Sequence, residues 1–250
     1  MPEPPPSPAR PDTLGNSDPR RSGRSGILGR AAASVLAALL RPAFHLLYHQ
    51  LAFTYDLVAW IVSAGEWADW RRCVIPQLPP GPVLEIAHGT GTLSFDMADA
   101  GFAVTAIDLS PAMGKIAAGK KRKWLNSGGH DAESPAGPAF VRADVRRLPF
   151  RSGYFSSATA TFPAEFLFQT EAMREVRRAL APGGRWSIVP AAFPKWIAKR
   201  LLRGEESQLS ASGWSTVIAP LKACGFRVRM DIVRRARSWV VRILAEKPIR

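Results

Sequence analysis

The sequence is poor in cysteine, histidine and tyrosine, with 2 Cys, 4 His and 3 Tyr among 250 residues. Two cysteines at this spacing match neither a disulfide-stapled scaffold nor a zinc knuckle. We therefore expect Cys73 and Cys224 to be free thiols in a reducing compartment. His45 and His49 lie four residues apart, but no acidic residue accompanies them, so we predict no metal site.

Long apolar runs are also absent. A membrane-spanning helix needs roughly 18 to 20 uninterrupted apolar residues, and the run at residues 31–40 ends at Arg41 and Pro42. The proline-rich stretch before this run is untypical of a secretory signal. We therefore expect a cytoplasmic protein.

Acidic residues are few relative to basic ones, and the formal net charge is +14. Such a charge attracts nucleic acid, anionic lipid or an acidic substrate, and does not choose among them. Lys195, Lys199 and Arg203 share one line of a predicted basic amphipathic helix. Either this helix makes peripheral contact with an anionic membrane, or its cations form the solvated edge of a packed helix.

Composition divides the chain into three parts. Residues 1–26 are rich in Pro, Ser, Gly and Arg and are predicted to be disordered, and residues 27–80 have a helical pattern. From residue 81 to residue 250, short β-branched runs alternate with helical patterns, which predicts one α/β domain with a parallel sheet. We predict strands at residues 83–87, 103–107, 139–142, 156–161, 185–189, 226–231 and 239–245, and helices at residues 92–100, 111–124, 171–180 and 213–224.

The most informative segment is VLEIAHGTG at residues 83–91, a strand that enters a glycine turn before a helix. Gly89 and Gly91 let the backbone approach a ligand closely. Asp108 ends the second predicted strand, where an acid can accept hydrogen bonds from both hydroxyls of a ribose. The alternative role for Asp108 is a cap of the helix that starts at Pro111.

Four segments, at residues 85–91, 107–113, 143–150 and 175–185, resemble in order and spacing the motifs of class I S-adenosylmethionine-dependent methyltransferases. The resemblance runs from residue 82 to residue 190. It is strongest to the methyltransferase type 11 subgroup, which includes methyltransferases of ubiquinone and menaquinone biosynthesis. It implies a Rossmann-like, seven-stranded, mostly parallel sheet with an antiparallel last strand, helices on both faces and an N-terminal helical cap.

The resemblance also implies S-adenosylmethionine as the cofactor and a set of residues around it. Glu85 would orient the glycine loop, and Tyr55 would either reach over the cofactor or pack within the N-terminal helices. The other implied contacts are Ala87, Gly89 and Gly91 with the methionine part, Asp108 with the ribose, and Leu109, Asp144 and Val145 with the adenine.

The chain departs from the family pattern at three positions. Ala87 replaces the first glycine of the loop and adds a methyl group near the cofactor. His88 occupies a commonly small position, and we interpret it as a loop residue that packs under the cofactor, with a catalytic base as the alternative. Ser156 stands where an acid commonly opens the fourth strand.

The acceptor side is less clear from the sequence. Phe162 and Phe166 follow the fourth predicted strand and either line an apolar acceptor pocket or pack against the next helix. Glu165 is a candidate base or substrate contact, or else a solvated loop acid, and the catalytic residue is otherwise unknown.

We therefore predict methyl transfer to a small or lipid-like acceptor. The alternatives are an RNA methyltransferase, which only the charge favours, and a protein that binds S-adenosylmethionine without turnover. A nicotinamide-dependent dehydrogenase is disfavoured because no tyrosine has a lysine four residues later.

Overall fold

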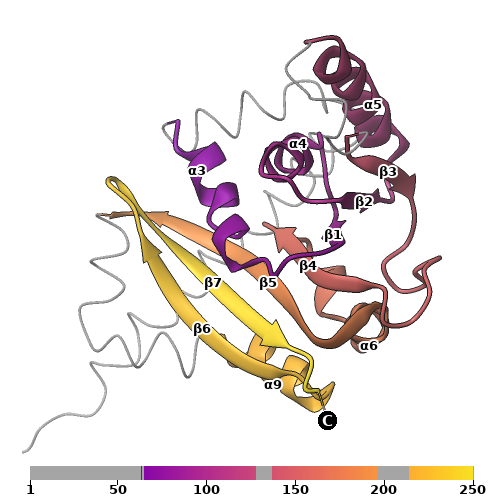
Figure 1. Cartoon of the computed structure of the whole chain (residues 1–250). Coiled ribbons are helices and arrows are strands. Elements are labelled where there is room, and N and C mark those ends of the chain that lie inside the picture. Colours follow the sequence, from indigo (N-terminus) through magenta and orange to yellow (C-terminus); the bar gives the residue numbers. More distant parts are fainter. Residues whose placement is uncertain (1–62, 64, 128–136, 196–213, 250) are drawn as a thin grey trace, which may run out of the picture. The chain divides into compact units, whose positions relative to one another are not determined.

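The computed structural model describes residues 63, 65–127, 137–195 and 214–249 (Figure 1). The chain divides into two units, residues 1–46 and 47–250, and every described residue belongs to the second. The predicted tail, most of the predicted N-terminal helical segment and nearly all of the predicted basic helix lie outside the described residues.

The described residues form a seven-stranded sheet in the order β3-β2-β1-β4-β5-β7-β6. Strands β1 to β5 pair in parallel, whereas β7 runs antiparallel to both of its neighbours, β5 and β6. This arrangement confirms the predicted mostly parallel sheet with an antiparallel last strand. The bounds are β1 Val83–Ile86, β2 Val104–Asp108, β3 Ala139–Arg142, β4 Phe155–Thr161, β5 Leu180–Pro194, β6 Arg227–Arg234 and β7 Ser238–Glu246.

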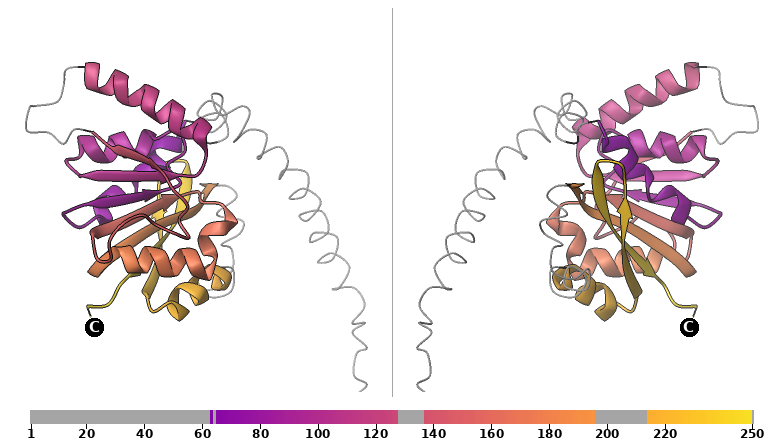
Figure 2. Two further views of the ribbon diagram at one scale, coloured as in Figure 1. Left: turned by 90° about the vertical axis from the view of Figure 1, so that its right-hand side faces the viewer. Right: turned by 90° about the vertical axis from the view of Figure 1, so that its left-hand side faces the viewer.

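Helices cover both faces of the sheet, as predicted (Figures 1 and 2). One face carries α3 (Trp67–Arg72), α4 (Thr92–Asp99) and α5 (Pro111–Asn126), and the other carries α6 (Thr170–Ala179) and α9 (Ser215–Ala223). Short 3-10 helices, η2 (Ile75–Gln77) and η3 (Glu165–Phe168), precede β1 and follow β4.

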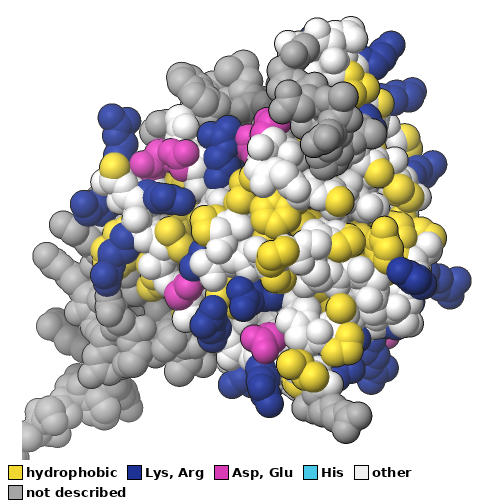
Figure 3. All heavy atoms as spheres, viewed as in Figure 1, with side chains coloured by type: hydrophobic (Ala, Val, Ile, Leu, Met, Phe, Trp, Pro, Cys, Tyr) yellow, Lys and Arg dark blue, Asp and Glu magenta, His cyan; other side chains and the backbone are white. Residues whose placement is uncertain are grey.

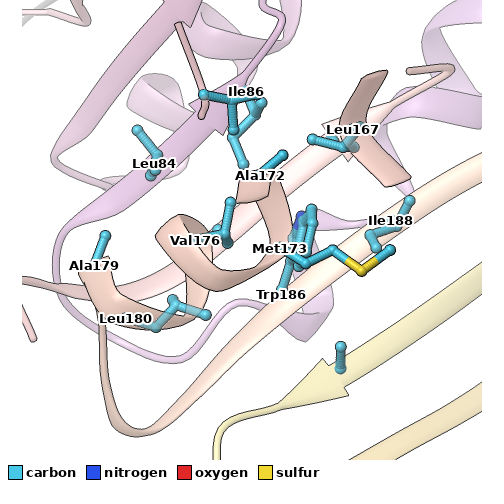
Figure 4. Close-up of a cluster of buried hydrophobic side chains, with 14 of the residues drawn as sticks. Leu84, Ile86, Leu167, Ala172, Met173, Val176, Ala179, Leu180, Trp186 and Ile188 are labelled. Atoms are coloured by element: carbon cyan, nitrogen blue, oxygen red, sulfur yellow. The ribbon is translucent and has the colours of Figure 1, made fainter. Parts of the chain in front are cut away.

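Successive side chains of the strands point to opposite faces of the sheet and contribute to two hydrophobic clusters, one on each face. Leu84 and Ile86 of β1 point into the cluster beneath α6, where Met173 and Trp186 are fully buried (Figure 4). Val83, one residue out of phase, belongs to the cluster formed with α3 and α4. A strand buried on both faces is typical of the centre of a doubly wound sheet, and it explains why the β1 residues other than Glu85 are all apolar.

Two predicted boundaries are wrong around β5. The strand extends from Leu180 to Pro194 because its antiparallel pairing with β7 continues as far as Pro194 opposite Ser238. The preceding helix α6 correspondingly ends at Ala179. Local periodicity could not show this extension, since the partner strand lies some 50 residues further along the chain.

Ser156 has a structural role at the start of β4. Its backbone N–H and its hydroxyl both donate to the carbonyl of Pro82, at 3.0 and 2.9 Å, and so fix the entry to β1. Within the described residues no helix is long and apolar enough to span a bilayer.

Candidate functional site

Three adjacent strands end at the same edge of the sheet. Because β2, β1 and β4 are parallel neighbours, the segments that follow Asp108, Ile86 and Thr161 are brought together there. In open α/β sheets, ligands bind at this carboxyl edge. The predicted site residues in these three segments therefore share one location.

Three residues of the loop after β1 have a left-handed backbone conformation. The φ angles are 57° at Ala87, 56° at Gly89 and 77° at Gly91. A Cβ atom at Gly89 would meet no atom within 4 Å, whereas one at Gly91 would lie 2.9 Å from the ring of Phe140. The loop thus packs tightly at Gly91 and leaves open space at Gly89, where a ligand can approach the backbone.

Asp108 ties this loop to the end of β2. One carboxylate oxygen accepts the Gly89 N–H at 2.9 Å, and the other accepts the Ser110 N–H at 2.8 Å. The side chain is buried, and a carboxylate has further lone pairs that can accept ligand hydroxyls. Asp108 thus faces the loop and also supports the start of α5, which Ser110 caps, while its predicted contact with a ribose stays a prediction.

Glu85 lies on β1 directly beneath the loop. It is fully buried and accepts a hydrogen bond from the hydroxyl of Ser94 on α4. Burial raises the pKa of its carboxyl to about 7, although the Ser94 hydrogen bond opposes the shift. Glu85 therefore links β1 to α4, and its predicted role in orienting the glycine loop stays a prediction.

His88 packs inside the loop. Its Nδ1 lies 2.8 Å from the carbonyl of Gly89, and its ring is tilted against Phe140 at a centroid distance of 4.9 Å. Burial lowers the pKa of the imidazole, while the nearby Asp108 opposes that shift. His88 is thus a buried ring held by a carbonyl and an aromatic neighbour within the protein.

The three residues expected beside the adenine differ in their surroundings. Leu109 is 55% exposed, so its side chain is available to a ligand at the end of β2. Val145 is buried in the cluster beneath α6, and so it packs in the core of the protein. Asp144 pairs with Arg146 at 2.6 Å, and this hydrogen bond lowers the pKa of its carboxyl. A ligand amino group would have to share the carboxylate with Arg146.

An aromatic wall stands at the end of β4. Phe162 has a left-handed φ of 51°, and its ring stacks on Trp67 of α3 at a centroid distance of 4.4 Å and an interplanar angle of 20°. Trp70 lies beside both rings, and its indole N–H donates to the hydroxyl of Ser238 at 2.6 Å. From the sequence we predicted only a helical pattern at residues 27–80 and gave these two tryptophans no role. Their spacing of three residues, which puts both indoles on one face of a helix, could have indicated the wall.

Phe166 and Glu165 lie on η3, just after this wall. Phe166 is 38% exposed and Glu165 is exposed, so neither is enclosed in a pocket by the described residues. Tyr55, the remaining predicted contact, lies outside the described residues. No group of three or more His, Cys, Asp or Glu that could hold a metal occurs in the part of the chain that the structure describes.

Comparison with known proteins gives a family match from β1 to the start of β5. Residues 83–184 match the family model described as a methyltransferase domain. The demethylmenaquinone methyltransferase of Beutenbergia cavernae is 33% identical over 162 residues, which are 63% of this chain and 62% of that protein. A second demethylmenaquinone methyltransferase, from Streptomyces griseus, is 32% identical over 164 residues, 64% of this chain and 65% of that protein. The match thus spans less than two thirds of these relatives' length.

Solved structures share the fold at low sequence identity. Magnesium protoporphyrin IX methyltransferase from Synechocystis PCC 6803, solved with bound SAH, has a TM-score of 0.52 and 15% identity over 82% of this chain and 99% of its own. The [4+2]-cyclase SpnF has a TM-score of 0.55 and 17% identity over 74% of this chain and 83% of its own. These likenesses concern the fold alone.

The left-handed Ala87 generates a stability prediction. A non-glycine residue at this φ costs about 1–2 kcal/mol, which exceeds the roughly 0.4–1 kcal/mol of unfolded-state entropy that glycine adds. Ala87→Gly should therefore raise the free energy of unfolding by up to about 1 kcal/mol, measured by urea titration. The control Ala118→Gly, at an exposed position inside α5, should lower it by about 1 kcal/mol. Equal losses in both variants would contradict the strain at Ala87.

The raised pKa of Glu85 generates a pH prediction. The folded protein keeps this proton up to about pH 7, whereas the unfolded chain releases it near the ordinary value of 4.5. The stabilisation that this group contributes is therefore fully present below pH 4.5. The free energy of unfolding then falls by about 3 kcal/mol as the pH rises to 7. Glu85→Gln lacks the fall, so its stability relative to the parent should rise between pH 5 and pH 8 in urea titrations. A difference that stays constant over this range would refute the assignment.

Proposed function

We propose that this protein, whose residues 83–184 match a methyltransferase-domain model, is a class I S-adenosylmethionine-dependent methyltransferase that transfers a methyl group to a small, apolar, lipid-like acceptor. The observation that carries the proposal is the joint position of the glycine loop, the Asp108 carboxylate and the aromatic wall at one edge of the sheet. The first two fit the cofactor, and the third fits an apolar acceptor.

The fit of the cofactor is supported by the shape of the loop. The space at Gly89 is open where a Cβ atom would otherwise intrude, and this allows the methionine part to lie against the backbone. Asp108 would hold the ribose hydroxyls with its remaining lone pairs, and the exposed Leu109 would cover the adenine. Bound there, S-adenosylmethionine supplies a methyl group on a sulfonium, which an acceptor nucleophile takes by direct displacement.

The residues of the chain then contribute mainly by positioning. Such a displacement gains much of its rate from the alignment of the two reactants, so it does not require a strong base. Phe162 and Trp67 present a rigid apolar surface at the end of β4, next to the loop after β1. Glu165, exposed on η3, is the candidate to receive a proton from the acceptor.

An apolar acceptor is favoured over RNA for three reasons. The curated relatives are named for demethylmenaquinone, a lipid-like quinone, and the aromatic wall suits an apolar ring. On the face drawn in Figure 3, Lys and Arg side chains are scattered among apolar and neutral atoms and do not form a continuous basic groove. We further propose that the protein works in the cytoplasm and that the basic segment with Lys195, Lys199 and Arg203 makes peripheral contact with an anionic membrane.

Asp108 allows a direct test of cofactor binding. Isothermal titration should show that the protein binds S-adenosylmethionine and S-adenosylhomocysteine but not NAD. Asp108→Ala should weaken S-adenosylmethionine binding by about 1.5–3 kcal/mol, the range for loss of charge-assisted hydrogen bonds. Thermal unfolding of the variant should be measured in parallel, since two buried N–H groups lose their acceptor. Binding of NAD alone would overturn the proposed function.

Trp67 allows a test of the acceptor side. With reduced demethylmenaquinone as acceptor and labelled S-adenosylmethionine, Trp67→Ala should raise the acceptor KM about tenfold or more, because an aromatic stacking surface is lost. Trp67→Phe should keep most of the activity, and cofactor affinity should be unchanged in both. Tyr154→Ala, an exposed aromatic residue at the opposite end of β4, serves as the control. Cofactor binding without transfer to any acceptor would instead favour a protein without turnover, and transfer to RNA that falls steeply with salt would favour the RNA alternative.

A further inference from the structure

A hollow lies at the opposite edge of the sheet from the glycine loop. The hollow has a volume of about 490 Å³ and is lined by Ser152, Arg174, Arg177, Arg178, Ala223, Cys224 and Lys247. Ser152 precedes β4, and Lys247 follows the antiparallel β7, so the hollow belongs to the edge where the parallel strands begin. In both views the end of the chain lies beside α6 and α9 (Figures 1 and 2).

The lining of the hollow contains four basic side chains and no acidic one. Arg178 is engaged structurally: its guanidinium binds both carboxylate oxygens of Glu175 and the carbonyls of Leu148 and Phe150. The side chains of Arg174 and Arg177, by contrast, make no hydrogen bond or ion pair with any residue that the structure describes. Glu175 thus compensates one cation of the four.

Arg177 is the most constrained of these groups. Its guanidinium lies over Gly225, where an added Cβ atom would come within 3.3 Å of it. Its Nε is buried and has no hydrogen-bond partner among the described residues. A buried donor without an acceptor is costly, so the described residues alone do not satisfy this guanidinium.

Lys247 brings a further cation to the same place. Its ammonium donates to the carbonyl of Leu180 at 2.6 Å, which leaves two N–H groups for other acceptors. Burial, together with the charge of Arg177, lowers the pKa of Lys247. The two cations therefore repel each other in a partly desolvated site, and an anion between them would relieve that repulsion.

Helix ends account for only part of this charge. Both α6 and α9 end close to the hollow, at Ala179 and Ala223, and the carbonyl end of a helix attracts cations. Hydrogen bonds such as the one from the Lys247 ammonium to the Leu180 carbonyl satisfy the carbonyl groups at these helix ends. It does not explain an arginine whose buried Nε lacks an acceptor.

We propose that this hollow is a binding site for a ligand that carries a phosphate or diphosphate group. Guanidinium groups match the tetrahedral, multiply charged phosphate through paired N–H donors, and three cations without a carboxylate partner suit a group with two or more negative charges. The volume exceeds that of a single phosphate and leaves room for an organic part of the ligand. The same phosphate chemistry occurs in soluble phosphate esters and in phospholipid headgroups.

Because of its position, we expect the hollow to bind its ligand independently of the proposed cofactor site. The glycine loop lies at the carboxyl ends of the parallel strands and the hollow at their amino ends, so the two ligands cannot touch. Ligand binding in the hollow does not depend on the proposed function. It can be measured even if the protein does not bind S-adenosylmethionine.

Cys224 provides a readout in the full-length protein. It is a free, partly exposed thiol in the lining of the hollow, whereas Cys73 is buried and burial raises the pKa of its thiol to about 11. Iodoacetamide should therefore alkylate Cys224 selectively. Inorganic pyrophosphate or ADP should slow this alkylation at least about fivefold, a protection typical of an occupied site, and S-adenosylmethionine should not.

Charge-neutral variants test which cations bind the ligand. Arg177→Gln and Lys247→Gln should each weaken pyrophosphate binding about tenfold or more in isothermal titration, as expected for losing a charge-assisted contact. Arg122→Gln removes the same charge from an exposed position on α5 and should change the affinity less than about twofold. Melting temperatures establish that all three variants are folded.

Vesicles distinguish the two sources of phosphate. Sedimentation with vesicles that contain phosphatidic acid, compared with neutral phosphatidylcholine vesicles, should show binding that Arg177→Gln abolishes if the ligand is a headgroup. Binding of pyrophosphate or ADP without vesicle binding would identify a soluble phosphate ester. If neither form binds, or if Arg122→Gln weakens binding as much as Arg177→Gln, the site does not exist and the cations serve only the helix ends.

Discussion

The candidate site depends on the hydrogen bonds of one carboxylate, that of Asp108. It accepts from Gly89 in the loop after β1 and from Ser110 at the start of α5, and so it joins three segments at the carboxyl edge. Asp108 can reach the loop because β1 and β2 pair in parallel. The pairing continues past β1, where the His88 N–H donates to the carbonyl of Ile107. The ligand-facing shape of the loop is thus held from the neighbouring strand, and the same group that would bind a ribose also keeps the loop in place.

The same edge carries the backbone strain of the described chain. The only non-glycine residues with positive φ in the described ranges are Ala87 and Phe162, which directly follow the adjacent strands β1 and β4. Each costs about 1–2 kcal/mol. The strain is tolerated because the strands beneath are buried on both faces, as Figure 4 shows for the cluster under α6. At Phe162 the strained backbone turns the ring onto Trp67, and this turn creates the aromatic wall.

The parts of the site that the sequence predicted are those formed by neighbours along the chain. The loop after β1 and the acid at the end of β2 are local patterns, and strand β3 has the predicted bounds at Ala139–Arg142. The stack of Phe162 on Trp67 joins residues 95 positions apart and has no local signature. The pairing of Asp144 with Arg146 was also not anticipated, because arginine next to a motif reads as ordinary surface charge. The predicted role of Tyr55 stays a prediction.

The excess of basic residues becomes informative only when each cation is considered with its partners. Arg242, for example, binds both oxygens of Asp231 and the carbonyl of Cys73, and Arg185 donates to the carbonyl of Gln77. Such arginines hold the strands and the segment around α3 together, and so they say nothing about a ligand. Arg174 and Arg177 differ because they line a hollow without an acceptor among the described residues. A net charge of +14 therefore does not by itself indicate nucleic acid, whereas unpaired guanidinium groups that converge in one hollow do indicate an anion.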